Sequence, residues 1–154
     1  DNLGGMAGHV VDFPVATGTM AVRSVPAVYT STTGLHMTFS AATGSTCMGA
    51  LSGMGAIMSV QIAAGSPPAP KVVWCAAHTG TDTAPIVTTS DGTNDPIVWY
   101  INSGKLTAVD GDSGMMLYTS SDTCSAVRQW TSPIAVKGRI VVAGDKHLCS
   151  WSPH

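Results

Sequence analysis

The sequence predicts an all-β protein whose 154 residues form one domain, 1–154. Helical periodicity is nearly absent, because Gly or Pro interrupts almost every window of a dozen residues. Short segments rich in β-branched and aromatic residues recur along the chain, bounded by Gly, Pro, Asn, Asp or Ser. Three of these segments share one pattern: a small or hydroxyl residue, then Pro, then β-formers. Such recurrence indicates a repeat architecture.

The clearest strand signals are short and end at turn-forming residues. They are PAVYTS (26–31), LHMTFSA (35–41), KVVWCA (71–76), PIVTTS (85–90), PIVWYIN (96–102), KLTAVD (105–110) and RIVVAG (139–144). A further strand is expected within DKHLCSW (145–151), and another after the turn that ends at Gly114. These segments group into meanders of roughly four strands.

The repeat is marked by Pro26, Pro85 and Pro133, which are about 59 and 48 residues apart. They define approximate units 24–82, 83–130 and 131–154, the last of which ends after its third strand. The fold expected is β-propeller-like, with about two and a half to three four-stranded blades; a β-sandwich or small barrel is the alternative. Because propellers close with about four to eight blades, the chain is expected to belong to a larger propeller or an assembly.

Four cysteines, Cys47, Cys75, Cys124 and Cys149, lack the short spacing of zinc or redox motifs and favour disulfides. Three connectivities are open. The repeat makes Cys47–Cys75 and Cys124–Cys149 the simplest, with Cys75 and Cys124 ending a unit and Cys47 and Cys149 each in a third strand. Paired cysteines and a low charge content predict an extracellular or secreted setting, with the periplasm or cell surface also open.

Composition argues against two classes of partner. Charged residues make up 10% of the chain and the formal net charge is -2, so no basic patch is available for nucleic acid. The longest mostly apolar stretch, Met48 to Ala64, is interrupted by glycines and polar residues and is too short to span a bilayer. We therefore expect no nucleic acid and no membrane span.

One motif resembles a known family. Ala108-x-Asp110-x-x-Ser113-Gly114-x-x-x-Tyr118 is similar to the A-x-D-x-x-T-G-x-x-x-W blade-docking motif of the quinoprotein, or PQQ-dehydrogenase-like, β-propellers, with Ser for Thr and Tyr for Trp. The resemblance covers Ser24 to about Trp151 and is weakest in the first unit. It implies propeller blades joined by this motif. Family members can hold a quinone with calcium, sometimes over adjacent cysteines, and this chain has no adjacent cysteines.

The motif also has a direct physical interpretation. Asp110 can accept hydrogen bonds from the backbone of the turn that follows it, Ser113 can bond locally, and Gly114 can adopt a left-handed conformation. Tyr118, on the next strand, can present its ring to the neighbouring unit. This interpretation makes the motif a means of adhesion between units.

The tetrapeptide Gly111-Asp112-Ser113-Gly114 also matches the nucleophile segment of chymotrypsin-like proteases, with His78 as a candidate base. The orienting acid could come from Asp82, Asp91 or Asp95. Only 35 residues separate His78 from Ser113, and only 41 follow Ser113, so the two barrels of that fold cannot be accommodated. A structural turn is the preferred interpretation.

The function expected is that of an extracellular, non-catalytic structural or binding module within a larger propeller or a homo-oligomeric or filamentous assembly. Its partners would be the remaining blades or identical subunits. We expect no catalytic, cofactor-binding or metal-ligating residues. The alternatives are a fragment of a PQQ-dependent dehydrogenase with quinone and calcium, a serine protease, and a soft-metal (copper) binder that uses methionines such as Met48, Met54, Met58, Met115 and Met116.

Overall fold

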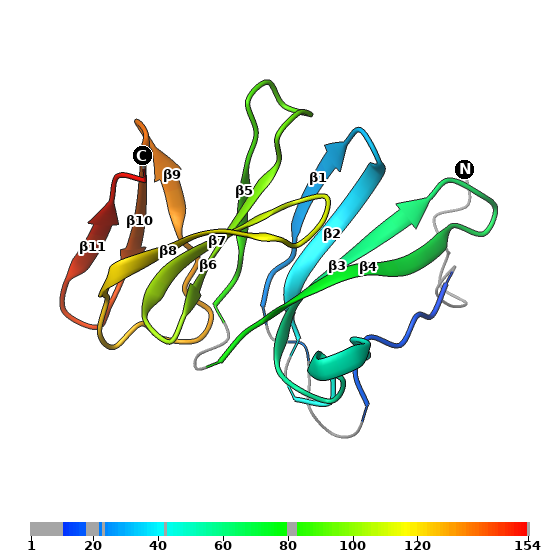
Figure 1. Ribbon diagram of the computed structural model, residues 1–154, viewed down its shortest axis with the longest axis horizontal. Coiled ribbons are helices and arrows are strands. Elements are labelled where there is room, and N and C mark those ends of the chain that lie inside the picture. Colours follow the sequence, from blue (N-terminus) through cyan, green and yellow to red (C-terminus); the bar gives the residue numbers. More distant parts are fainter. Residues whose placement is uncertain (1–10, 18–21, 23, 42, 80–82, 154) are drawn as a thin grey trace, which may run out of the picture.

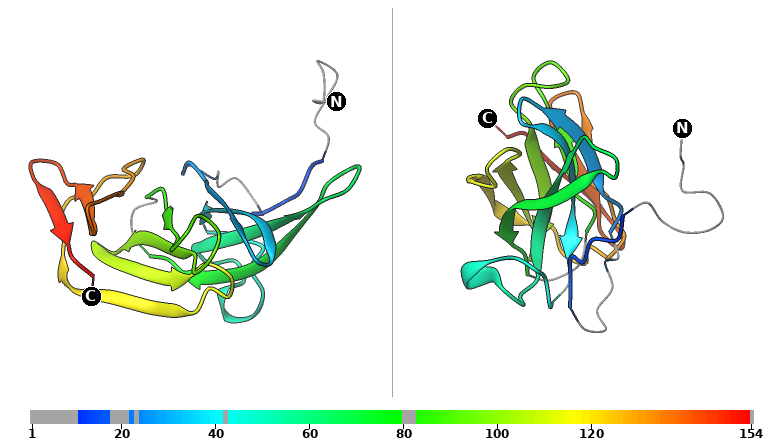
Figure 2. Two further views of the ribbon diagram at one scale, coloured as in Figure 1. Left: turned by 90° about the horizontal axis from the view of Figure 1, so that it is seen from above. Right: turned by 90° about the vertical axis from the view of Figure 1, so that its right-hand side faces the viewer.

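The described residues form three antiparallel sheets, which lie side by side in a curved row (Figures 1 and 2). The computed structural model describes residues 11–17, 22, 24–41, 43–79 and 83–153. In each sheet, strands that follow one another in sequence also pair with one another, and none of the sheets is closed. The prediction of an all-β fold is confirmed.

The strands have the following bounds. The first sheet contains β1 (Ala27–Ser31), β2 (Gly34–Ala41), β3 (Ala56–Ala63) and β4 (Ala69–Ala77), and a short 3-10 helix, η1 (Gly49–Leu51), lies between β2 and β3. The second contains β5 (Ile86–Thr88), β6 (Ile97–Asn102), β7 (Lys105–Asp110) and β8 (Met116–Thr123). The third contains β9 (Ile134–Val136), β10 (Arg139–Ala143) and β11 (Leu148–Trp151).

The three prolines of the repeat occupy equivalent places. Pro26, Pro85 and Pro133 each stand one residue before the first strand of a sheet, where the missing backbone N–H removes no hydrogen bond from the middle of a ladder. Each sheet lies inside one of the expected units, 24–82, 83–130 and 131–154. First strands of neighbouring sheets come close together, β1 to β5 and β5 to β9. The sheets therefore repeat in space as well as in sequence.

The second sheet is packed on both faces. Along β6, Val98 and Tyr100 belong to the apolar cluster shared with the first sheet, whereas Trp99 and Ile101 belong to the cluster shared with the third. This division follows from the two-residue period of a strand, which sends alternate side chains to opposite faces. A third apolar cluster covers the other face of the first sheet, around Phe39 and Met58.

β3 was not among the strands expected from the sequence. Its first five residues are all buried, so it lacks the alternation of apolar and polar residues that marks a half-exposed strand. The stretch from Met48 to Ala64 that contains it begins with η1 and a turn at Gly53, which has a φ of +74°. Because these turn-forming residues precede β3 directly, the sequence around it does not have the pattern of a strand.

Two disulfides close the loops that the repeat favoured. Cys47 is bonded to Cys75 and Cys124 to Cys149, with Cα–Cα distances of 6.1 and 5.9 Å. Cys149 lies in β11, the third strand of its sheet, but the expectation of a third strand at Cys47 is wrong. Cys47 precedes η1 in the connection between β2 and β3, a segment that turns at glycines rather than pairing in the sheet.

The disulfides are compatible with an oxidising or extracellular environment. Across the described ranges, no helix has the length and apolar character needed to cross a membrane.

Candidate functional site

The motif turn, residues 110–115, connects β7 to β8 and is held by its own side chains. Asp110 Oδ1 accepts hydrogen bonds from the Ser113 N–H at 2.8 Å and from the Ser113 hydroxyl at 2.6 Å. The N–H of Gly114 donates to the Asp110 carbonyl at 2.8 Å, and Gly114 has a φ of +72°. The turn thus has the local bonds and the left-handed glycine that its sequence predicts.

The motif turn is also bound to the first sheet. The carbonyl oxygen of Gly111 accepts a hydrogen bond from the Tyr29 hydroxyl at 2.6 Å and another from Trp74 Nε1 at 2.7 Å. A Cβ placed on Gly114 would lie 2.8 Å from two ring atoms of Trp74. Gly114 is therefore required twice, for its backbone conformation and for the close approach of the indole. This contact joins the first and second sheets.

A polar cluster extends this junction. One carboxylate oxygen of Asp112 accepts hydrogen bonds from the hydroxyls of Ser31, at 2.5 Å, and Thr33, at 2.8 Å. Because Thr33 donates its only hydroxyl proton to Asp112, its oxygen accepts the hydrogen bond from His36 Nε2 at 2.8 Å. His36 Nδ1 then accepts from the hydroxyl of Ser59 at 3.3 Å. Every polar atom of the imidazole has a partner in its neutral form.

His36 is held as a neutral core histidine. Its side chain is 1% exposed, and its ring stacks on Tyr29 with centroids 5.1 Å apart and planes 9° from parallel. Burial lowers the pKa of His36, and the carboxylate of Asp112 acts in the opposite direction. Burial likewise raises the pKa of Tyr29, so its phenol remains a donor to Gly111. These side chains form a packed junction in which the neutral rings of His36 and Tyr29 are both hydrogen-bonded.

Neither serine arrangement in this region has the geometry of a protease. Asp112 Oδ1 and His36 Nε2 are 3.9 Å apart, beyond hydrogen-bond distance, and Ser59 is fully buried. Ser113, the serine of the tetrapeptide, is bonded to Asp110 instead. A nucleophile must reach both a base and a substrate, so the geometry favours the structural turn.

His78 lies away from Ser113. Its Nε2 is 3.1 Å from the carbonyl oxygen of Ile101, four residues along β6 from Ile97, which pairs with Asp110 at the start of the motif turn. That separation along a strand is about 13 Å. Asp91 and Asp95 lie in the exposed β5–β6 connection, and Asp82 lies outside the described residues.

The remaining motif residues face the third sheet. Ala108 is buried in the cluster that includes Ile140 and Trp151, and the half-buried Tyr118 packs against that cluster. The ring of Tyr118 meets Trp99 of its own sheet edge-on, with centroids 6.3 Å apart. It also lines a pocket of about 570 Å³ that includes residues of the β9–β10 hairpin. The motif therefore contacts both neighbours of the second sheet. Its turn binds the first sheet, and Ala108 and Tyr118 pack against the third.

The two outer flanks differ from these filled junctions. The outer face of the first sheet has an apolar groove of about 450 Å³, which we call the flank groove. It is lined by Val11, Phe13, Val15, Val22, Ser24, Pro26, Met37, Phe39, Val60, Ile62, Pro68 and Pro70. At the other flank, the third sheet has three strands, with β11 at one edge and β9 at the other.

The methionines considered for copper do not form one site. Met58 is fully buried in the first sheet, whereas Met48 and Met54 are exposed around η1 and Met115 and Met116 are exposed near the motif turn. Within the described part of the chain, one group of His, Cys, Asp or Glu side chains is close enough to hold a metal ion: Cys124, His147 and Cys149.

Sequence reasoning missed the partners of the motif turn. Tyr29 and Trp74 are 82 and 37 residues from Gly111, so no local pattern connects them to it. The signal available was their position as aromatic residues in expected strands of the preceding unit. Sequence reasoning also missed the group formed by Cys124, His147 and Cys149. The signal for it was the two-residue spacing of His147 and Cys149, since that spacing places side chains on one side of an extended chain.

Comparison with known protein families, with curated proteins and with solved structures finds no match.

Replacing Ser113 by Ala should lower the free energy of unfolding by about 0.5–1.5 kcal/mol, the net contribution of a local hydrogen bond. Ser121→Ala is the matched control, because Ser121 is exposed in β8 and has no side-chain hydrogen bond with another described residue; its effect should be smaller. Urea denaturation measures both. Covalent labelling of Ser113 by a fluorophosphonate would contradict the structural role.

Proposed function

We propose that this chain is a non-catalytic structural or binding module made of three blade-like sheets, similar to those of quinoprotein-type β-propellers. It functions outside the cell within a larger propeller or a homo-oligomeric or filamentous assembly. The observation that carries the proposal is the use of the motif turn. Its carbonyl at Gly111 and its carboxylate at Asp112 are both engaged by side chains of the adjacent sheet.

The repeated arrangement of the sheets supports the same conclusion. The first strands lie close together, and the second sheet packs on a neighbour at each face. An arrangement that adds one sheet after another continues until the ends meet or until something covers them. The first and third sheets are the ends of this series.

Both ends offer surface to a partner. The flank groove is apolar over nearly its whole lining, and the third sheet leaves Ile134 and Leu148 exposed by 58% and 74%. Free strand edges and apolar faces favour association with another chain or with further strands of the same polypeptide. The remaining blades or identical subunits would bury these surfaces.

Light scattering of the purified chain at micromolar concentration tests the proposal. We expect a weight-average mass well above 15.7 kDa, because the flanks of separate copies cover one another. Ile62→Lys, in the flank groove, should lower that mass. Leu117→Lys should not, since Leu117 is exposed on β8 of the second sheet and does not line the groove.

A monodisperse 15.7 kDa species would overturn the assembly. An unchanged mass for Ile62→Lys would show that the flank groove takes no part in it.

A further inference from the structure

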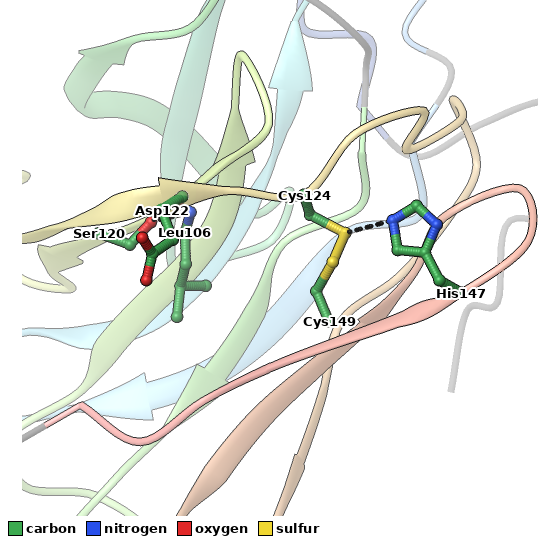
Figure 3. The surroundings of a disulfide bond; sticks show 6 residues. All are labelled: Leu106, Ser120, Asp122, Cys124, His147 and Cys149. Carbon is green, nitrogen blue, oxygen red and sulfur yellow. Dashed lines mark hydrogen bonds between the residues drawn. A yellow bond between two sulfur atoms is a disulfide. The ribbon is translucent and has the colours of Figure 1, made fainter.

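A histidine stands directly beside one of the two disulfides. Cys124–Cys149 joins the end of β8 to β11, and His147 Nε2 lies 3.8 Å from the sulfur of Cys124. Figure 3 shows the imidazole directed at the disulfide from the loop that precedes β11. The nitrogen and both sulfurs lie within 4.8 Å of one another. One imidazole and two potential thiolates form the donor set of a Cys₂His metal site.

The backbone holds this histidine in place. The N–H of Gly144 donates to the carbonyl of His147 at 2.9 Å, which closes the turn between β10 and β11. A Cβ on Gly144 would lie 2.9 Å from both Cε1 and Nε2 of the imidazole. The ring therefore occupies space that exists only because residue 144 has no side chain. Its position follows from the turn, although the histidine itself is exposed.

Cys124 is fixed on the opposite side. Its N–H donates to the Gly104 carbonyl at 2.7 Å, at the end of an irregularity in which three residues of β8 face Leu106. There the Ser120 hydroxyl accepts a hydrogen bond from the Leu106 N–H at 3.0 Å. The same hydroxyl donates a hydrogen bond to the backbone carbonyl of Asp122 at 2.7 Å; Figure 3 labels these three residues. The two cysteines and the histidine thus approach one another from two stabilised segments.

The spacing suits a tetrahedral ion. With Zn–S near 2.3 Å and Zn–N near 2.0–2.1 Å, tetrahedral angles place sulfur and nitrogen about 3.6 Å apart and the two sulfurs about 3.8 Å apart. The distance from the Cys124 sulfur to His147 is already 3.8 Å. Once the S–S bond is broken, the two sulfurs must move apart to reach that tetrahedral separation of about 3.8 Å. Side-chain rotation supplies that movement.

We propose that reduction of the Cys124–Cys149 disulfide converts Cys124, Cys149 and His147 into a binding site for a thiophilic divalent cation of the zinc type. A phosphine breaks the S–S bond and becomes the phosphine oxide by taking oxygen from water, which leaves two thiols. The cation displaces both thiol protons and is bound by Cys124, Cys149 and His147. Because His147 is exposed to solvent, a water molecule can complete the tetrahedron as the fourth ligand.

The metal then replaces a covalent link between the second and third sheets with a coordinate one. Cys124 and Cys149 would keep the sheets joined in both redox states, with His147 added in the metal-bound one, which distinguishes this disulfide from Cys47–Cys75. That disulfide has no comparable group among the described histidines and carboxylates.

Cobalt titration of the phosphine-reduced protein without oxygen tests the site. We expect one equivalent of Co²⁺ to bind with a thiolate charge-transfer band and the visible bands of tetrahedral cobalt, and Zn²⁺ to displace it. His147→Ala should weaken binding about tenfold or more, since even outer-shell partners of metal ligands contribute about 10–100-fold. The pair Cys47→Ser and Cys75→Ser should retain the site, and the pair Cys124→Ser and Cys149→Ser should lose it.

Equal affinity in His147→Ala, or binding that survives loss of Cys124 and Cys149, would overturn the proposal, as would the absence of binding. If circular dichroism shows that reduction unfolds the chain, Zn²⁺ should restore the β-sheet signal in the parent protein and not in His147→Ala, because binding is coupled to folding. Failure of Zn²⁺ to restore the signal would equally exclude the site.

Discussion

Gly114→Ala is expected to lower the free energy of unfolding by about 2–5 kcal/mol. A left-handed backbone costs a non-glycine residue about 1–2 kcal/mol, and forcing an atom into a packed contact adds about 1–3 kcal/mol. Both costs arise here, because Gly114 has a φ of +72° and its added Cβ would lie 2.8 Å from the indole of Trp74. Urea denaturation followed by tryptophan fluorescence measures the loss.

Gly138→Ala separates the two costs. Gly138, in the β9–β10 hairpin, has a φ of +71° and no atom within 4 Å of an added Cβ, so it carries the backbone cost alone, about 1–2 kcal/mol. In a Trp74→Leu background, the additional loss at Gly114 should shrink, since the clashing ring is gone. Equal losses at the two glycines would mean that the motif turn is not pressed against the first sheet.

The sequence predicted much of the fold because its signals are local. Pro26, Pro85 and Pro133 mark the start of each sheet, and most strands lie where short runs of β-formers end at turn residues. β3 escaped because it is buried on both faces, and the position of Cys47 was misjudged because the first unit inserts η1 before its third strand. Where burial on both faces removes the alternation of apolar and polar residues, or an insertion breaks the repeat, the sequence pattern no longer predicts the position of a strand.

In the candidate site too, the local interactions could be predicted from the sequence and the contacts between sheets could not. Asp110, Ser113 and Gly114 interact within a few residues of one another, so their roles follow from turn chemistry. The hydrogen bonds from Tyr29 and Trp74 to Gly111 depend on how two sheets pack, which no local pattern encodes. The Asp112 cluster is of the same kind, since its serine and threonine partners lie about 80 residues earlier.

Removing the Cys124–Cys149 disulfide by replacing both residues with Ala is expected to cost about 3.5 kcal/mol and to loosen the third sheet selectively. The sequence separation of 25 residues sets the loop-closure entropy that the unfolded chain regains. The disulfide also ties β11 to the end of β8, and the third sheet has only three strands of 3, 5 and 4 residues. Sheets that small have little independent stability.

Replacing Cys47 and Cys75 with Ala is the matched control. Its separation of 28 residues predicts nearly the same loss, again about 3.5 kcal/mol, but both cysteines belong to the first unit. Hydrogen exchange followed by mass spectrometry should therefore show faster exchange in β9, β10 and β11 for the first variant and unchanged exchange there for the second. If the third sheet exchanges equally fast in both variants, the Cys124–Cys149 disulfide is not what holds it to the second sheet, and the apolar cluster around Ile140 and Trp151 must hold it instead.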